Sequence, residues 1–181
     1  MSDTLIGYLN QWSEVCPDDA WLRERADGQI RDWSWAESAA QIRAMAAWQE
    51  DNLAGPGLNV GILSRNRPHW FFADLGSIAA GNVVIPMFTT LPGDTAKYVM
   101  DFTDMQVLFL GETENWDQVE PMLPEHIQII TLPGVELDRE HLKWDDLVGQ
   151  YAGRTPSYQC KPNDMISIVF TSGTTGVPKG V

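Results

Sequence analysis

Short apolar runs alternate with helix-like segments along most of the chain. Each run is apolar on both faces and only a few residues long, which is typical of strands in a parallel sheet that is covered on both sides. Short loops separate the runs from the helical segments, and this order predicts an α/β fold with a largely parallel sheet flanked by helices. The expected strands are 58–63, 83–87, 107–110, 127–132 and 165–170, and the expected intervening helices are 68–80, 92–102, 116–122 and 144–151.

The first part of the chain predicts a helix, a hairpin and a second helix. Residues 5–15 place their apolar side chains at helical spacing, and 20–24 and 30–33 read as two strands that pair back on each other. Ser34 and Glu37 have the spacing of a capping box, in which each side chain bonds the backbone N–H of the other residue. An alanine-rich helix is therefore expected from this box to residue 48.

Acidic residues dominate the charge of the chain. The sequence has 12 lysines and arginines against 25 aspartates and glutamates, and a formal net charge of −13. A surface of this sign repels the phosphates of nucleic acid, so a nucleic-acid partner is not expected. A local cationic pocket can still hold a small anion, because nearby donors outweigh distant, screened charge.

The sequence gives no sign of a disulfide, a transmembrane segment or a metal site. Cys16 and Cys160 are far apart, which predicts two reduced thiols. The most apolar stretch, 78–88, is too short to span a membrane, and a cytoplasmic protein without a transmembrane segment is expected. No metal site is expected, because the histidines lack ligand spacing and the aspartates read as solvated surface residues. These residues are His69, His126, His141, Asp94, Asp101, Asp104, Asp145 and Asp146.

The segment from Thr171 to Gly180 has the composition of a phosphate-binding loop. It directly follows the last expected strand and reads Thr-Ser-Gly-Thr-Thr-Gly-Val-Pro-Lys-Gly. Glycines let the backbone approach a ligand closely, hydroxyl groups and successive N–H groups donate hydrogen bonds, and Lys179 adds a positive charge. Lys179 is followed by Gly180, so the loop is not a Walker A motif, and it lacks a glycine of the dinucleotide fingerprint.

This loop resembles the signature phosphate loop of the adenylate-forming (AMP-binding) superfamily at all ten positions. Residues 31–37, 61–70 and 80–90 resemble segments of its long-chain acyl-CoA synthetases, or fatty-acid–CoA ligases. The resemblance implies an incomplete part of the large N-terminal domain of that fold. Residues 1–181 are then the N-terminal portion of an AMP-binding domain that ends just after the loop 171–180, with the C-terminal part absent.

The resemblance also implies a reaction and a set of site residues. A fatty acid would attack ATP to give acyl-adenylate and pyrophosphate, and CoA would then release AMP and form acyl-CoA. Lys179 would be the catalytic residue, and the Mg²⁺ ligand would lie downstream of residue 181. The fragment alone would therefore be inactive. The residues expected to bind ATP are Thr171, Ser172, Gly173, Thr174, Thr175, Gly176 and Lys179.

Two other functions remain open from the sequence. The adenylate could be passed to a carrier protein instead of CoA, or the chain could be a nucleotide-binding module without catalysis. Small-molecule partners are expected in each case. The acyl chain length, the oligomeric state and any peripheral membrane contact stay open.

Overall fold

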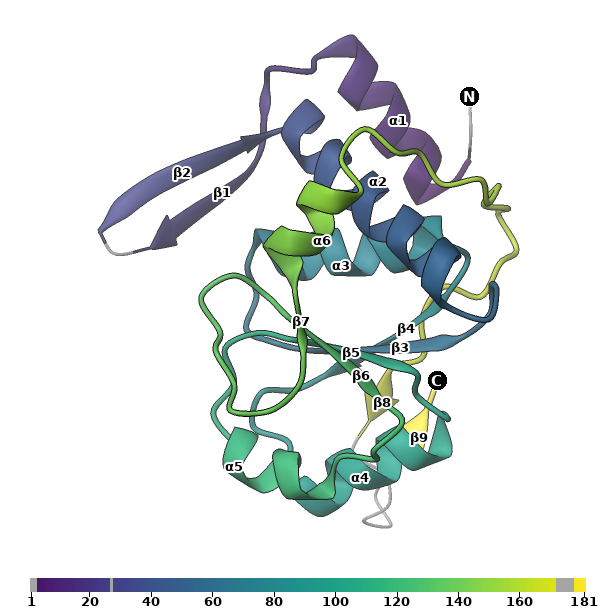
Figure 1. The fold of residues 1–181 in the computed structure, drawn as a ribbon. Helices are drawn as coiled ribbons and strands as arrows, with labels where there is room; N and C mark the ends of the chain where they lie inside the picture. The colour runs from purple at the N-terminus through teal and green to yellow at the C-terminus, as the bar shows by residue number, and fades with distance from the viewer. Residues whose placement is uncertain (1–2, 27, 172–177) are drawn as a thin grey trace.

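A computed structural model describes residues 3–26, 28–171 and 178–181, and it shows a five-stranded parallel sheet between two layers of helices (Figure 1). The strand order is β4-β3-β5-β6-β7. The elements are α1 (Leu5–Val15), β1 (Ala20–Ala26), β2 (Gln29–Ser34), α2 (Trp35–Asn52), β3 (Asn59–Leu63), α3 (Pro68–Ala79), β4 (Val83–Met87), α4 (Gly93–Phe102), β5 (Val107–Leu110), α5 (Trp116–Val119), a 3-10 turn (Glu120–Met122), β6 (Gln128–Thr131), β7 (Leu142–Lys143), α6 (Trp144–Gln150), β8 (Phe170–Thr171) and β9 (Lys179–Gly180).

Each face of the sheet has its own hydrophobic core. Along β5, Val107 and Phe109 pack with residues of α1, α2, α3 and α6, whereas Leu108 and Leu110 pack with residues of α4 and α5. All four side chains are buried, because neighbouring residues of a strand point to opposite faces and both faces are covered. The α/β fold and its parallel sheet are thereby confirmed.

Local signals at the N-terminal end of α2 are also confirmed. The Ser34 hydroxyl accepts a hydrogen bond from Glu37 N, and the Glu37 carboxylate accepts one from Ser34 N, so the capping box forms. The helix runs to Asn52, four residues beyond the expected end. The strands β1 and β2 pair antiparallel as expected and project away from the sheet (Figure 1).

The expected strand at 165–170 is wrong for most of its length. Next to β4 it forms one parallel bridge, between Val84 and Ser167, and only Phe170 belongs to a named strand. Val84 N bonds Ile166 O at 2.9 Å, and Ile168 N bonds Val84 O at 3.0 Å. The next bond of this ladder would need an N–H at residue 86, which is proline and has none.

Gly93 lies where the start of α4 touches the backbone of α5. A Cβ atom at this position would lie 2.2 Å from the carbonyl oxygen of Gln118. We expect Gly93→Ala to lower the free energy of unfolding by about 1–3 kcal/mol, because the backbone must shift to relieve the overlap. Urea denaturation measures this change.

Gly149 in α6 provides the matched control. A Cβ atom there would meet nothing within 4 Å. Gly149→Ala should raise the free energy of unfolding by about 0.5–1 kcal/mol, because alanine loses less backbone entropy in a helix. Equal effects of the two substitutions would contradict the proposed overlap between α4 and α5.

Candidate functional site

The two ends of the expected phosphate loop lie side by side. Strand β8 pairs antiparallel with β9, which places Phe170 opposite Gly180 and Thr171 opposite Lys179. The Thr171 hydroxyl donates to the carbonyl oxygen of Lys179 at 3.4 Å. We call β8 and β9 together the loop frame. Of the expected ATP-binding residues, Thr171 and Lys179 belong to this frame, and Ser172, Gly173, Thr174, Thr175 and Gly176 lie outside the described residues.

Backbone pairing and close packing hold the loop frame together. Val169 and Val181 exchange two backbone hydrogen bonds, of 2.9 and 3.0 Å, next to the β8–β9 pair. A Cβ atom at Gly180 would lie 2.9 Å from the side chain of Ile168, so a glycine lets the two strands approach. Phe170 is buried and packs edge-on against Phe102 of α4, with 6.0 Å between ring centroids. The frame is thus fixed to the helix layer formed by α4.

A cavity of about 410 Å³ adjoins the loop frame at the carboxyl end of β4. Small-molecule sites in α/β proteins typically lie at this end of the strands. None of the described residues that line the cavity is charged. They are Pro86, Met87, Phe88, Leu91, Pro92, Thr95, Val99, Phe170, Thr171 and Pro178. A second cavity, of about 490 Å³, shares Pro86, Met87 and Phe88 with the first and is also lined by Ser64, Arg65 and Trp70.

The point where the strand order reverses lies between β3 and β5, and contacts fill it. A Cβ atom at Gly111 would lie 2.0 Å from the Ser64 hydroxyl oxygen, and Arg65 N bonds Glu112 O at 2.9 Å. The Arg65 guanidinium also pairs with the carboxylates of Glu112 and Glu114, at 3.0 and 3.3 Å. The two cavities described above both border β4, and the second also borders Ser64 and Arg65, which follow β3.

Lys179 is an exposed residue without an ion pair in the described part of the chain, where the ion pairs all join other residues. Lys179 directly follows Pro178, which lines the uncharged cavity, and a cation without a carboxylate partner there suits an anionic group. Lys179 is the described side chain of the frame that fits a phosphate, and the Thr171 hydroxyl would have to release the Lys179 carbonyl oxygen to donate to one.

The histidines do not gather at this site. His69 is 4% exposed and lies among aromatic rings in the core on the α3 side of the sheet. Burial, together with the charges of Arg67 and Arg31, lowers the pKa of His69 to about 3, so it is neutral near pH 7. His126 lies 4.0 Å from Asp104, and Nδ1 of His141 donates to Arg139 O at 2.7 Å.

Two further findings concern the described residues alone. They contain no group of three or more His, Cys, Asp or Glu side chains arranged to hold a metal ion. None of their helices combines the length and apolarity needed to cross a bilayer.

Sequence reasoning missed the residues that line the cavity, including Phe88, Leu91 and Thr95. The available signal was their place directly after the strand 83–87, at the carboxyl edge where ligands bind. Their apolar character alone could not separate them from core residues.

Comparison with known proteins shows which family the chain belongs to. A family model described as "AMP-binding enzyme" matches residues 9–181. Long-chain-fatty-acid–CoA ligase 1 of Cavia porcellus is 28% identical over 98% of this chain and 28% of its own length. The peroxisomal long chain acyl-CoA synthetase 7 of Arabidopsis thaliana is 31% identical over 88% of this chain and 25% of its own length. The chain thus spans about a quarter of the length of these curated relatives.

Solved structures share the fold. The anthranilate CoA ligase AuaEII, in complex with anthranoyl-AMP, superposes with a TM-score of 0.84 at 19% identity, over 97% of this chain and 33% of that one. Acetoacetyl-CoA synthetase from Streptomyces lividans gives a TM-score of 0.84 at 24% identity, over 97% and 29%. Because the family model covers nearly the whole chain, the chain belongs to the AMP-binding enzyme family, whose members form adenylates.

Proposed function

We propose that this chain is the phosphate-binding N-terminal part of a ligase that activates a long-chain fatty acid with ATP and transfers it to CoA. The observation that carries the proposal is the loop frame, which places Thr171 opposite Lys179 at the rim of an apolar cavity. The residues of the intervening segment complete the phosphate-loop signature of the family. The names of the curated relatives support a fatty acid as substrate and CoA as acceptor.

ATP would supply an electrophilic α-phosphate, whose new bond to the carboxylate oxygen forms as the bond to pyrophosphate breaks. Lys179 holds positive charge where the β- and γ-phosphates would lie, and the Thr171 hydroxyl lies beside it. Such charge-assisted contacts fix a polyphosphate and offset the negative charge that builds up on the leaving group. The Mg²⁺ ion would be held by one or two carboxylates together with the phosphates, and we propose that these carboxylates lie outside the described residues.

Transfer to a carrier protein is the alternative acceptor step. It shares the adenylation half of the reaction, so the loop frame serves both outcomes equally. We favour CoA because both curated relatives are named for acyl-CoA formation. The lack of a helix able to cross a bilayer in the described residues agrees with a protein that acts from the aqueous phase, and the cytoplasm is the proposed compartment.

Titration of the chain with ATP tests the proposal. We expect Lys179→Ala to weaken ATP binding about 10–100-fold, because one charge-assisted contact to phosphate is lost. Lys179→Arg should retain part of the affinity, since it keeps the charge but changes the geometry. Isothermal calorimetry measures both.

Lys143→Ala is the matched control, because it removes an exposed lysine of β7, which lies at the opposite edge of the sheet from β4. Its ATP affinity should stay within about twofold of the wild type, since exposed charges at a distance are screened. Equal affinities of Lys179→Ala and the wild-type chain would refute the assignment. In the complete enzyme, the same substitution should slow fatty-acid-dependent pyrophosphate release at limiting ATP.

A further inference from the structure

The chain reaches the loop frame through a long segment that has almost no regular structure. We call residues 151–169, between α6 and β8, the connecting segment. Apart from the single bridge at Ser167, it contains no helix or strand. It passes along the end of α2 and then reaches β4 and the loop frame (Figure 1). Because backbone groups in such a segment lack ladder partners, its path depends on individual contacts.

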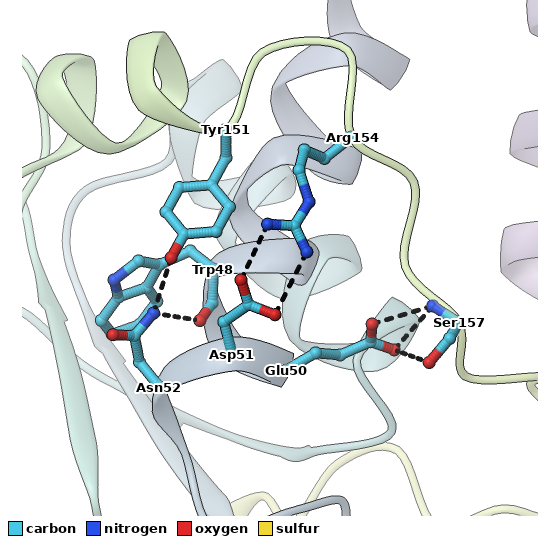
Figure 2. A network of polar contacts seen from close by, with 7 residues as sticks. All are labelled: Trp48, Glu50, Asp51, Asn52, Tyr151, Arg154 and Ser157. Atoms are coloured by element: carbon cyan, nitrogen blue, oxygen red, sulfur yellow. Dashed lines mark hydrogen bonds and ion pairs between the residues drawn. The ribbon is translucent and has the colours of Figure 1, made fainter.

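The last residues of α2 supply those contacts, as Figure 2 shows. The Glu50 carboxylate accepts hydrogen bonds from Ser157 N at 2.8 and 2.9 Å, from the Ser157 hydroxyl at 3.3 Å and from Tyr158 N at 2.7 Å. Two successive backbone N–H groups thus converge on one charged acceptor. Hydrogen bonds to a charged group are stronger than neutral ones, so this is a firm anchor for the connecting segment.

A second group of contacts fixes the residues that follow Tyr158. The Tyr158 hydroxyl donates to the Asp164 carboxylate at 2.9 Å, and the same carboxylate accepts from Lys161 N at 2.7 Å. These donors lower the pKa of Asp164, the Lys161 backbone N–H most strongly. The Tyr158 ring also packs on Gly81, where a Cβ atom would lie 2.8 Å from it. The turn between Tyr158 and Asp164 is therefore fixed at both ends.

The fixed turn leads directly to the loop frame. Ile166 and Ile168 bond Val84 of β4, and Val169 bonds Val181 beside β9. Pro86 prevents further bonding to β4, as described above, so the sheet holds this part of the segment by the bridge at Val84 alone. The Cys160 thiol also donates to Ile78 O at 3.3 Å, so the anchor at Glu50 is one of a few contacts that direct the chain into β8.

We propose that Glu50 is a positioning residue for the phosphate site, acting through Ser157 and Tyr158 on the loop frame. This inference rests on the proposed function, since the frame matters for catalysis only if it borders an ATP site. Glu50 lies at the end of α2 and would touch neither ATP nor the acyl group. Its effect is to fix the direction from which Thr171 and Lys179 meet the ligand.

Two measurements on Glu50→Ala test the inference. Hydrogen exchange reports on the amides of Ile168 and Val169, which are bonded next to the loop frame. We expect their exchange to become about tenfold faster. Calorimetric titration with inorganic tripolyphosphate should show binding about tenfold weaker. Glu50→Gln keeps one acceptor oxygen and should fall between the wild type and Glu50→Ala.

Asp51→Ala is the matched control at the same helix end. It removes the exposed ion pair with Arg154, of 2.8 and 3.2 Å, which holds the connecting segment upstream of Ser157. Exchange at Ile168 and tripolyphosphate affinity should both stay within about twofold of the wild type, because exposed pairs contribute little.

The outcomes separate positioning from general stability. If Glu50→Ala merely destabilised the fold, exchange of the Leu132 amide, bonded to Leu110 in the sheet, would speed up by the same factor. That result, or unchanged exchange at Ile168 and Val169, would overturn the inference. Faster exchange there with unchanged tripolyphosphate affinity would overturn it too. A wild-type chain that does not bind ATP would instead overturn the proposed function, and exchange alone would then decide whether Glu50 fixes the frame.

Discussion

Replacing Trp144 with alanine should lower the free energy of unfolding by about 3–5 kcal/mol, the range for truncating a buried tryptophan. The side chain is 0% exposed and is one of the largest that are completely buried. Its ring packs edge-on against Phe109 of β5 and His69 of α3, with centroids 5.8 and 5.7 Å apart. Its Nε1 donates to the Gln41 side chain of α2 at 2.7 Å. One side chain thus joins α6 to the sheet and to both neighbouring helices.

Two variants separate the contributions to this effect. Trp144→Phe keeps an aromatic ring but leaves the Gln41 oxygen without its donor, so we expect a smaller loss, of about 1–3 kcal/mol. Trp12→Ala removes a tryptophan that is 41% exposed, and it should cost less than Trp144→Ala because less apolar area returns to water. Chemical denaturation monitored by circular dichroism measures all three. A loss below about 1 kcal/mol for Trp144→Ala would show that the cavity collapses or that the site is loosely packed.

The core around Trp144 belongs to the part of the fold that the sequence predicts well. Buried parallel strands produce continuous apolar runs, and capping boxes place both partners three residues apart, so both signals are local. The strands at 83–87 and 107–110 and the start of α2 at Trp35 agree with expectation for this reason. Strand β7 was missed, because two residues, Leu142 and Lys143, are too few to show a pattern.

The expected strand at 165–170 failed for a reason that is not local. Its apolar residues suit a strand, but the partner that it would extend is β4, which contains Pro86. Val84 pairs with Ser167 in a parallel register, and in this register the next hydrogen bond from β4 would have to come from the backbone N–H of residue 86. Proline has no such N–H, so the pairing stops there. Pairing register between distant segments cannot be read from the composition of either segment.

The candidate site likewise has one part that the sequence predicts and another part that it does not. The order of residues from Thr171 to Gly180 predicts a phosphate loop, but the antiparallel pairing of β8 with β9 was not expected from the sequence. The anchor at Glu50 could not be predicted, because its partners Ser157 and Tyr158 are more than a hundred residues away in the sequence. A glutamate near a helix end reads as a solvated side chain until the fold brings donors to it.

Replacing His69 with phenylalanine should make the protein more resistant to acid. Burial lowers the pKa of His69 to about 3 in the folded chain, against 6.5 without burial. Between these values the unfolded chain binds one more proton, so the free energy of unfolding rises with pH across this window. The stabilisation is complete above pH 6.5 and is lost as pH falls toward 3. At pH 4.5 the loss reaches about 2–3 kcal/mol, at 1.36 kcal/mol per pH unit.

Asp74 acts in the opposite direction, and this makes a second variant informative. Burial raises the pKa of Asp74 from 3.8 to about 6, so here the folded chain binds the extra proton. Its destabilising effect is complete above pH 6 and is relieved as pH falls toward 3.8. In the wild-type chain the two effects largely cancel between pH 4 and 6.

Urea denaturation at pH 7 and 4.5 tests both effects. On acidification, the free energy of unfolding of His69→Phe should rise by about 2–3 kcal/mol relative to the wild type, and that of Asp74→Asn should fall by about 2 kcal/mol. Parallel pH profiles for all three proteins would mean that burial shifts the pKa of neither group.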